Sequence, residues 1–309
     1  MARLRGAAAL LFPVFFGAAL LFFLDVSAAA AREGVTLCLQ TVLPSLFPFF
    51  VLSSLLVQSD VPRLLSRAMA GVMYPLFGVS GAGASALILG LLGGYPVGAR
   101  TVAELYGRGE IAREEAEQLL AFCNNSGPGF FLGVCGTAVF GSARAGAYLY
   151  PIHVGAALVT GVLLRRDLGL PRRKAVSRQR APFDLAAALP AAVQGSFAAV
   201  GSVSAFVIFF MVLLRLLSLV PALAALPPLP RAALFGFMEM TNGVNALPAT
   251  RAGFVLCAAI MNWGGLSVQA QTRALLAGSA LSARRCVIGK AVQALAGVPL
   301  ALLAAQRLF

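Results

Sequence analysis

Charged side chains are scarce in this chain. Asp, Glu, Lys and Arg make up 11% of its 309 residues, whereas 60% are hydrophobic, and the mean hydropathy is +0.88. A soluble domain of this length needs a far more polar surface, so the composition indicates an integral membrane protein. The formal charge of +13 does not indicate nucleic-acid binding. The basic residues gather in short segments between apolar runs, which is typical of cytoplasmic loops of membrane proteins.

Metal ligands and catalytic groups are also scarce. The five cysteines show no paired spacing, and the single histidine, His153, lies in an apolar segment. Because a zinc site needs several such ligands and a nucleophile needs a neighbouring base, we expect no metal site, no cofactor and no enzymatic activity. We interpret the cysteines as small buried hydrophobes and His153 as polar packing, with proton handling as an alternative.

Four short breaks rich in glycine, proline or asparagine interrupt the apolar segments. They lie at residues 93–100, 124–128, 239–243 and 262–265. Adjacent glycines followed by Tyr-Pro end a helix, because glycine frees the backbone and proline lacks the N–H group. Non-helical backbone at membrane depth is tolerated only where it is buried in protein or lines a wet cavity. The breaks therefore predict a binding site.

The N-terminal third is expected to contain two spans. Residues 1–34 resemble a signal peptide, with Arg3 and Arg5 before an apolar run, but this run is long enough to cross a membrane. We therefore expect an uncleaved N-terminal transmembrane helix. Residues 35–57 are expected to form a second span, and residues 69–81 an interfacial connector. Residues 110–122 are expected to form a solvated helix at the membrane surface.

The order of spans and breaks occurs twice. Residues 35–164 form a first repeat, residues 165–189 a basic cytoplasmic linker, and residues 190–309 a second repeat. Each repeat reads as span, broken hairpin, interrupted span and span. The first repeat starts outside and the second inside, so we expect them to be inverted, as in secondary transporters. The basic residues assigned to the inside of the second repeat are Arg284, Arg285 and Lys290. The predicted fold is thus an all-α membrane protein with two inverted repeats, re-entrant hairpins and interrupted helices.

The predicted site lies at these breaks. Residues 83–106 have arms too short to span, so they are expected to form a re-entrant hairpin with Arg100 facing inward. Glu239 is the one acidic residue at the centre of an apolar segment, and intramembrane carboxylates are usually functional. It is expected to bind a coupling proton or cation, to pair with Arg100, or to form structural hydrogen bonds. The predicted substrate-binding residues are Gly94, Tyr95, Arg100, Thr101, Asn124, Asn125, Ser126, Thr241, Asn242, Asn262 and Gln269.

These motifs resemble the nucleoside-recognition, or Gate, family of membrane proteins, and within it the sporulation integral membrane protein branch. The resemblance covers about 35–300 and rests on 94–100, 123–128, 239–243 and 264–269. Where relatives in this family are expected to carry Lys, this chain has Arg100, which keeps the charge but changes its geometry. The resemblance implies a role in endospore formation and movement of dipicolinate, a small aromatic dianion, across the outer forespore membrane.

The function predicted from the sequence is therefore transport of a small organic anion, with dipicolinate as the implied substrate. The expected partners are that anion and the lipid bilayer, with a coupling proton or cation as an alternative and no nucleic acid. Two other hypotheses are a non-transporting scaffold or assembly component of sporulation, and a transporter of another solute such as a nucleoside. The substrate, coupling ion, direction and oligomeric state do not follow from the sequence, because a fold does not determine a substrate.

Overall fold

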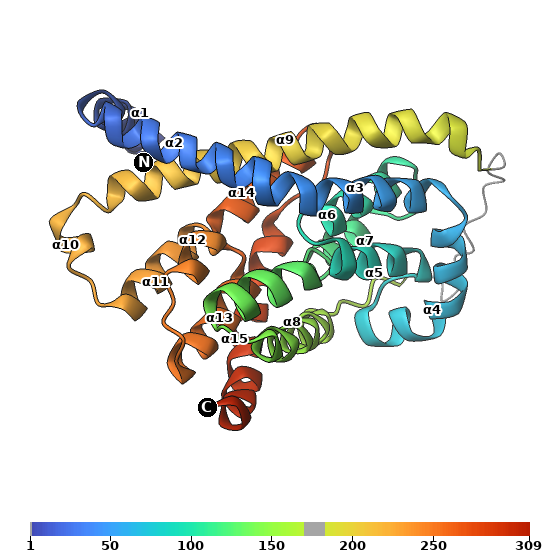
Figure 1. The fold of residues 1–309 in the computed structure, drawn as a ribbon. Coiled ribbons are helices and arrows are strands. Elements are labelled where there is room, and N and C mark those ends of the chain that lie inside the picture. Colours follow the sequence, from blue (N-terminus) through green and yellow to red (C-terminus); the bar gives the residue numbers. More distant parts are fainter. Residues whose placement is uncertain (1, 170–182) are drawn as a thin grey trace.

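The computed structural model of the protein describes residues 2–169 and 183–309 (Figure 1). Within these two ranges every regular element is a helix. The all-helical prediction is therefore confirmed. Much of the predicted basic linker, 165–189, lies outside the described residues.

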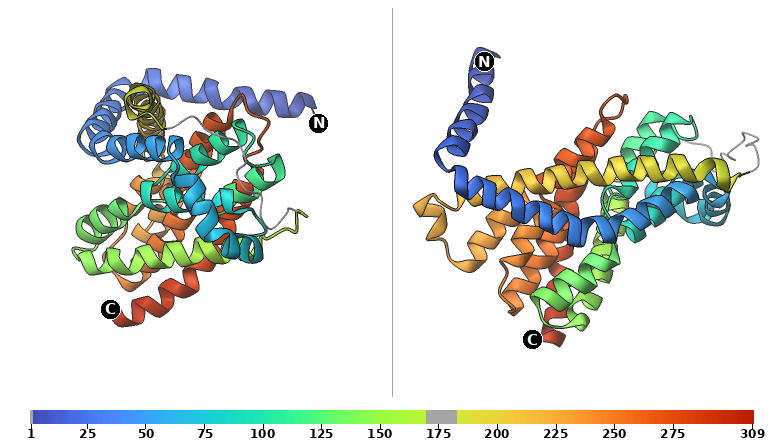
Figure 2. Two further views of the ribbon diagram at one scale, coloured as in Figure 1. Left: turned by 90° about the vertical axis from the view of Figure 1, so that its right-hand side faces the viewer. Right: turned by 45° about the horizontal axis from the view of Figure 1, so that its top comes forward.

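The N-terminal helices differ from the prediction. Helix α1 (Ala2–Phe22) ends in a sharp bend of 99°, after which the chain continues as α2 (Leu24–Leu37), the π-helical turn η1 (Cys38–Val42) and α3 (Leu43–Gln58). The expected single helix over 1–34 is thus wrong, since its last third belongs to the next element. Figure 2 shows α1 pointing away from the rest of the protein. The wider π-turn just before Pro44 accommodates its missing N–H, so the chain stays helical through this proline.

The predicted connector at 69–81 is also wrong. These residues belong mostly to α4 (Val61–Phe77), which starts with Pro62 in its first turn and ends at Gly78 with a left-handed φ of 67°. The short 3-10 turn η2 (Gly81–Gly83) then leads into α5, with a bend of 103°. A single glycine, Gly71, lies inside α4 and does not interrupt it, so the glycines of this segment mark its end and not a connector.

The predicted re-entrant hairpin forms at the expected break. Helices α5 (Ala84–Gly93) and α6 (Val97–Gly107) pack against each other around a turn in which Gly94 has a φ of 81°. The next segment is interrupted, as predicted, between α7 (Arg113–Leu120) and the π-helix η3 (Phe130–Val139). Helix α8 (Ala143–Leu163) is the span that closes the predicted first repeat.

Helix α7 is not the fully solvated helix that its charges predict. Glu115 and Gln118 are buried, and the Glu115 carboxylate accepts a hydrogen bond of 2.7 Å from the Ser80 N–H. The Gln118 amide donates to the Leu164 carbonyl oxygen over 2.9 Å. These polar groups therefore satisfy backbone groups at the ends of neighbouring helices, which a charge pattern alone does not reveal.

The second half also contains a broken hairpin and an interrupted helix. Helix α9 (Leu185–Leu217) lies alongside α2 and α3, and α10 (Pro221–Ala224) follows it. The broken hairpin consists of α11 (Pro228–Met238) and α12 (Met240–Asn245), and the interrupted helix of α13 (Arg251–Trp263) and α14 (Gly265–Leu276). Helix α15 (Arg284–Leu308) closes the chain. All four predicted breaks are thus confirmed, whereas the inversion of the repeats and their boundaries remain predictions.

Several helices are long and apolar enough to cross a membrane. Four qualify by themselves: α8, α9, the combined α13 and α14, and α15. The two bent pairs, α1 with α2 and α4 with α5, raise the number among the described residues to as many as six. Together with its composition, this identifies the chain as an integral membrane protein.

The two largest hydrophobic clusters form most of the core. One joins α4 to α7 and includes Phe77 and Phe122, while the other joins η3, α8, α13 and α15 and includes Phe131 and Phe254. Both the 121–139 segment and α15 pass from the first cluster to the second. Asn124, Asn125 and Ser126 in the first segment and Lys290 and Gln293 in α15 lie where each segment passes between the clusters, and all five are buried.

Candidate functional site

The four helix breaks meet in the interior. A Cβ atom placed on Gly94, in the first break, would lie 3.1 Å from the backbone nitrogen of Gly127, in the second. A Cβ on Gly264, in the fourth, would lie 3.1 Å from the Tyr95 hydroxyl, and one on Gly265 would lie 3.0 Å from the backbone nitrogen of Met240, in the third. The breaks therefore form a continuous series of close contacts at glycines, and all three of these glycines have a positive φ that other residues rarely adopt.

A buried hydrogen-bond network lies at this junction. The amide oxygen of Asn125 accepts hydrogen bonds from the Lys290 ammonium over 3.2 Å and from the Gln293 amide over 3.0 Å. The Ser126 N–H donates to His153 Nε2 over 3.1 Å. All of these side chains are at most 3% exposed. Groups from α15, α8 and the second break are thus joined in one network that water does not reach.

The network extends into the first and fourth breaks. The Lys290 ammonium lies 5.0 Å from the centre of the Tyr95 ring, and the Tyr95 hydroxyl donates to the Met261 carbonyl oxygen over 3.4 Å. Next to it, the Asn124 amide donates to the Thr272 hydroxyl over 3.0 Å. Of the predicted site residues, the structure brings together Gly94, Tyr95, Asn124, Asn125, Ser126 and Asn262.

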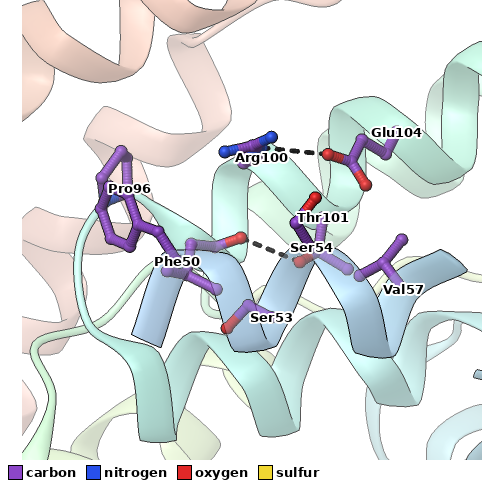
Figure 3. A pocket seen from close by; sticks show the side chains of 9 residues that line it. Phe50, Ser53, Ser54, Val57, Pro96, Arg100, Thr101 and Glu104 are labelled. Carbon is purple, nitrogen blue, oxygen red and sulfur yellow. Dashed lines mark hydrogen bonds and ion pairs between the residues drawn. The ribbon is translucent and has the colours of Figure 1, made fainter. Parts of the chain in front are cut away.

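Arg100 lies apart from this network. Its guanidinium forms an ion pair of 3.0 Å with Glu104, one helical turn further along α6, and donates to the Gly195 carbonyl oxygen over 3.3 Å. Arg100 and Thr101 line a cavity of about 10 Å³ between α3 and α6, shown in Figure 3. That volume is about the space needed by one water molecule. The predicted pairing of Arg100 with Glu239 is wrong, because a carboxylate on the same helix already meets the guanidinium.

Glu239 forms local structural hydrogen bonds. Its carboxylate is the N-cap of α12, accepting from the backbone N–H groups of Thr241 over 3.0 Å and Asn242 over 2.7 Å, and from the Asn242 side chain over 2.8 Å. Gln269, the last predicted site residue, donates to the Trp263 carbonyl oxygen over 3.3 Å. These residues thus satisfy backbone groups at the breaks, as expected if Glu239 has the structural role that is one of its three predicted roles. A coupling role for Glu239 remains a prediction.

Replacing Glu239 with Ala is expected to lower the stability of the protein by about 1–2 kcal/mol, because α12 loses the cap that satisfies its first N–H groups. Glu239→Gln should cost less, since its amide oxygen still accepts. The five cysteines are all buried, so a thiol-reactive dye reports unfolding of the detergent-solubilised protein. Glu114→Ala, which removes an exposed carboxylate from α7, is the control. Equal melting temperatures for the two alanine variants would contradict the capping role.

Sequence reasoning missed Lys290 and Gln293. Lys290 was assigned to the inside with Arg284 and Arg285, but its side chain is fully buried. One signal could have found it, because only two of the 24 basic residues are lysines and one of them falls within an apolar helix. The buried residues of α15 include Cys286, Lys290, Gln293 and Gly297, whose spacing places them on one helical face.

An all-helical chain with several spans and a polar junction of broken helices is an integral membrane protein with discontinuous helices, a class that includes transporters. Residues 39–213, more than half of the chain, match the Gate family, described as nucleoside recognition. The chain belongs to this family. It is also 29% identical over 302 residues to the sporulation integral membrane protein YlbJ of Bacillus subtilis (strain 168), covering 86% of this chain and 74% of the relative. No solved structure matches it.

Proposed function

We propose that this protein is a sporulation-associated transporter that moves a small organic anion, with dipicolinate as the candidate substrate, across the outer forespore membrane. The observation that carries the proposal is the meeting of four helix breaks around a buried polar network that contains an ammonium group. Broken helices leave backbone N–H and C=O groups free to bind a solute at membrane depth. The similarity to a sporulation membrane protein supports the biological context.

The electrostatics of the junction favour an anion. Lys290 contributes a positive charge, and α6 and α14 both start at a break, where their N-terminal N–H groups add partial positive charge. In the proposed cycle, the two halves of the protein, 35–164 and 190–309, separate on one side of the membrane at a time. The cavity beside Arg100, at about 10 Å³, is far too small for dipicolinate, so binding beside Arg100 requires such a separation.

The purified protein in liposomes is expected to accumulate dipicolinate saturably. Terbium enclosed in the vesicles reports its arrival by luminescence. In a Bacillus subtilis strain that lacks the sporulation relative, expression of this chain should direct dipicolinate from the mother cell into the spore core. Accumulation of uridine in place of dipicolinate would favour a nucleoside transporter. Stable co-purification with sporulation proteins, without flux of either solute, would favour the scaffold hypothesis and overturn transport.

A further inference from the structure

Lys290 is a buried cation with only neutral partners. Its ammonium donates to the Gln293 amide oxygen over 2.7 Å and to the Asn125 amide oxygen over 3.2 Å, and it faces the Tyr95 ring. Among the described residues, no carboxylate lies within ion-pair distance of it. A buried ammonium normally has an anionic partner, because desolvation of the charge costs several kcal/mol that neutral acceptors offset only in part.

The Lys290 ammonium has an N–H donor that neither amide oxygen uses. An ammonium has three N–H donors, and two of them are taken by the amide oxygens. His153 accepts the Ser126 N–H at Nε2, so the neutral ring carries its proton on Nδ1. Among the described residues, His153 Nδ1 and Asn262 Oδ1 make no hydrogen bond of good geometry, but the two side chains are close enough to interact with each other.

The position of Lys290 fits a binding role. It lies on the buried face of α15 and contacts residues of the first and second breaks, so movement of the two halves would change its surroundings. Arg100, the cation expected to bind substrate, is 23% exposed and already neutralised by Glu104. Lys290 is thus the cation at the junction that still lacks a counter-charge. A compact ammonium on a flexible stem can also exchange partners without the fixed geometry of a guanidinium.

We propose that Lys290 is the residue that binds a carboxylate group of the substrate, and that the carboxylate takes over the ammonium from the amide oxygens of Asn125 and Gln293. The ligand class is a small carboxylate. The proposal rests on the proposed transport function. It assigns the binding of the substrate carboxylate to Lys290 and not to Arg100. The neutral amides hold the charge when no carboxylate is bound, and they release it because their hydrogen bonds are weaker than a charged pair.

Two substitutions of Lys290 test the proposal in the full-length protein in liposomes, with dipicolinate and benzoate as probes. Lys290→Met is expected to lower saturable uptake of both by about tenfold or more, because the carboxylate loses its counter-charge. Its melting temperature without ligand should stay the same or rise, since an apolar chain of similar volume avoids the desolvation of the ammonium. Lys290→Arg should retain part of the uptake. Arg273→Gln, which removes an exposed charge from α14, is the control and should transport as the unaltered protein does.

The outcomes separate this proposal from the proposed function. If the unaltered protein and Lys290→Met take up dipicolinate equally, Lys290 does not bind the carboxylate, whereas the proposed transport function stands. If Lys290→Met loses uptake and thermal stability together, Lys290 is a structural residue, and its proposed role in binding the carboxylate is wrong. If the unaltered protein transports uridine but neither carboxylate, both proposals fail. Lost uptake at full or increased stability, with partial recovery in Lys290→Arg, is the result that supports it.

Discussion

Gly98→Ala is expected to lower the stability of the protein by about 3 kcal/mol or more, close to the upper end of what overpacking costs. A Cβ atom on Gly98 would overlap the Cys123 carbonyl oxygen and lie 3.0 Å from the Asn124 Cα. A Cβ on Gly90 would overlap the same oxygen. Glycines from both arms of the α5–α6 hairpin thus contact the start of the second break, where the neighbouring atoms are backbone and have little freedom to move.

Gly107→Ala is the matched control for this experiment. Gly107 ends the same helix, α6, and has no atom within 4 Å of its expected Cβ position. Alanine there should leave the melting temperature unchanged or raise it slightly, because alanine restricts the unfolded chain more than glycine does. The two variants are compared by dye labelling of the buried cysteines during heating. Similar melting temperatures would show that the hairpin and the second break do not pack as tightly as described.

Local backbone chemistry explains why the helix breaks were predictable. A pair such as Gly93-Gly94 before Tyr95-Pro96 disfavours a helix in any surroundings, so the hairpin appears where the sequence places it. The bend at Phe23 was missed because no glycine or proline marks it. Helix α4 does not follow from the sequence because the glycines at its end indicate a break but do not show where the preceding helix begins.

The site was only partly predictable, because pairing depends on tertiary contacts. The pairing of Arg100 with Glu104 follows the i, i+4 rule and could have been predicted from the sequence. The burial of Lys290 is indicated only weakly by its place within an apolar helix, since Arg284 and Arg285 begin the same helix and suggest a surface position. Tertiary packing turns α15 so that a face with Lys290 and Gln293 meets Asn125, which is 165 residues earlier in the chain.

Asn125→Leu is expected to destabilise the protein by about 3–5 kcal/mol, because it leaves the Lys290 ammonium without one of its two acceptors in a buried site. The Gln293 amide loses an acceptor at the same time. Adding Lys290→Met to Asn125→Leu should restore much of the lost stability, since the group that needed the acceptor is gone. This coupling energy follows from a double-mutant cycle measured by thermal unfolding, without any substrate.

Asn124→Leu provides the control for the cycle. Asn124 bonds to the Ala99 N–H and to Thr272 and makes no described hydrogen bond to Lys290. Asn124→Leu should therefore also destabilise the protein, but adding Lys290→Met should change its stability no more than Lys290→Met changes that of the unaltered protein. Equal recovery in both pairs would mean that Lys290→Met stabilises the protein generally, and that Asn125 does not hold the ammonium. Recovery specific to Asn125 would show that the buried charge is held by an exchangeable neutral group, which is the physical condition for an anion to displace it.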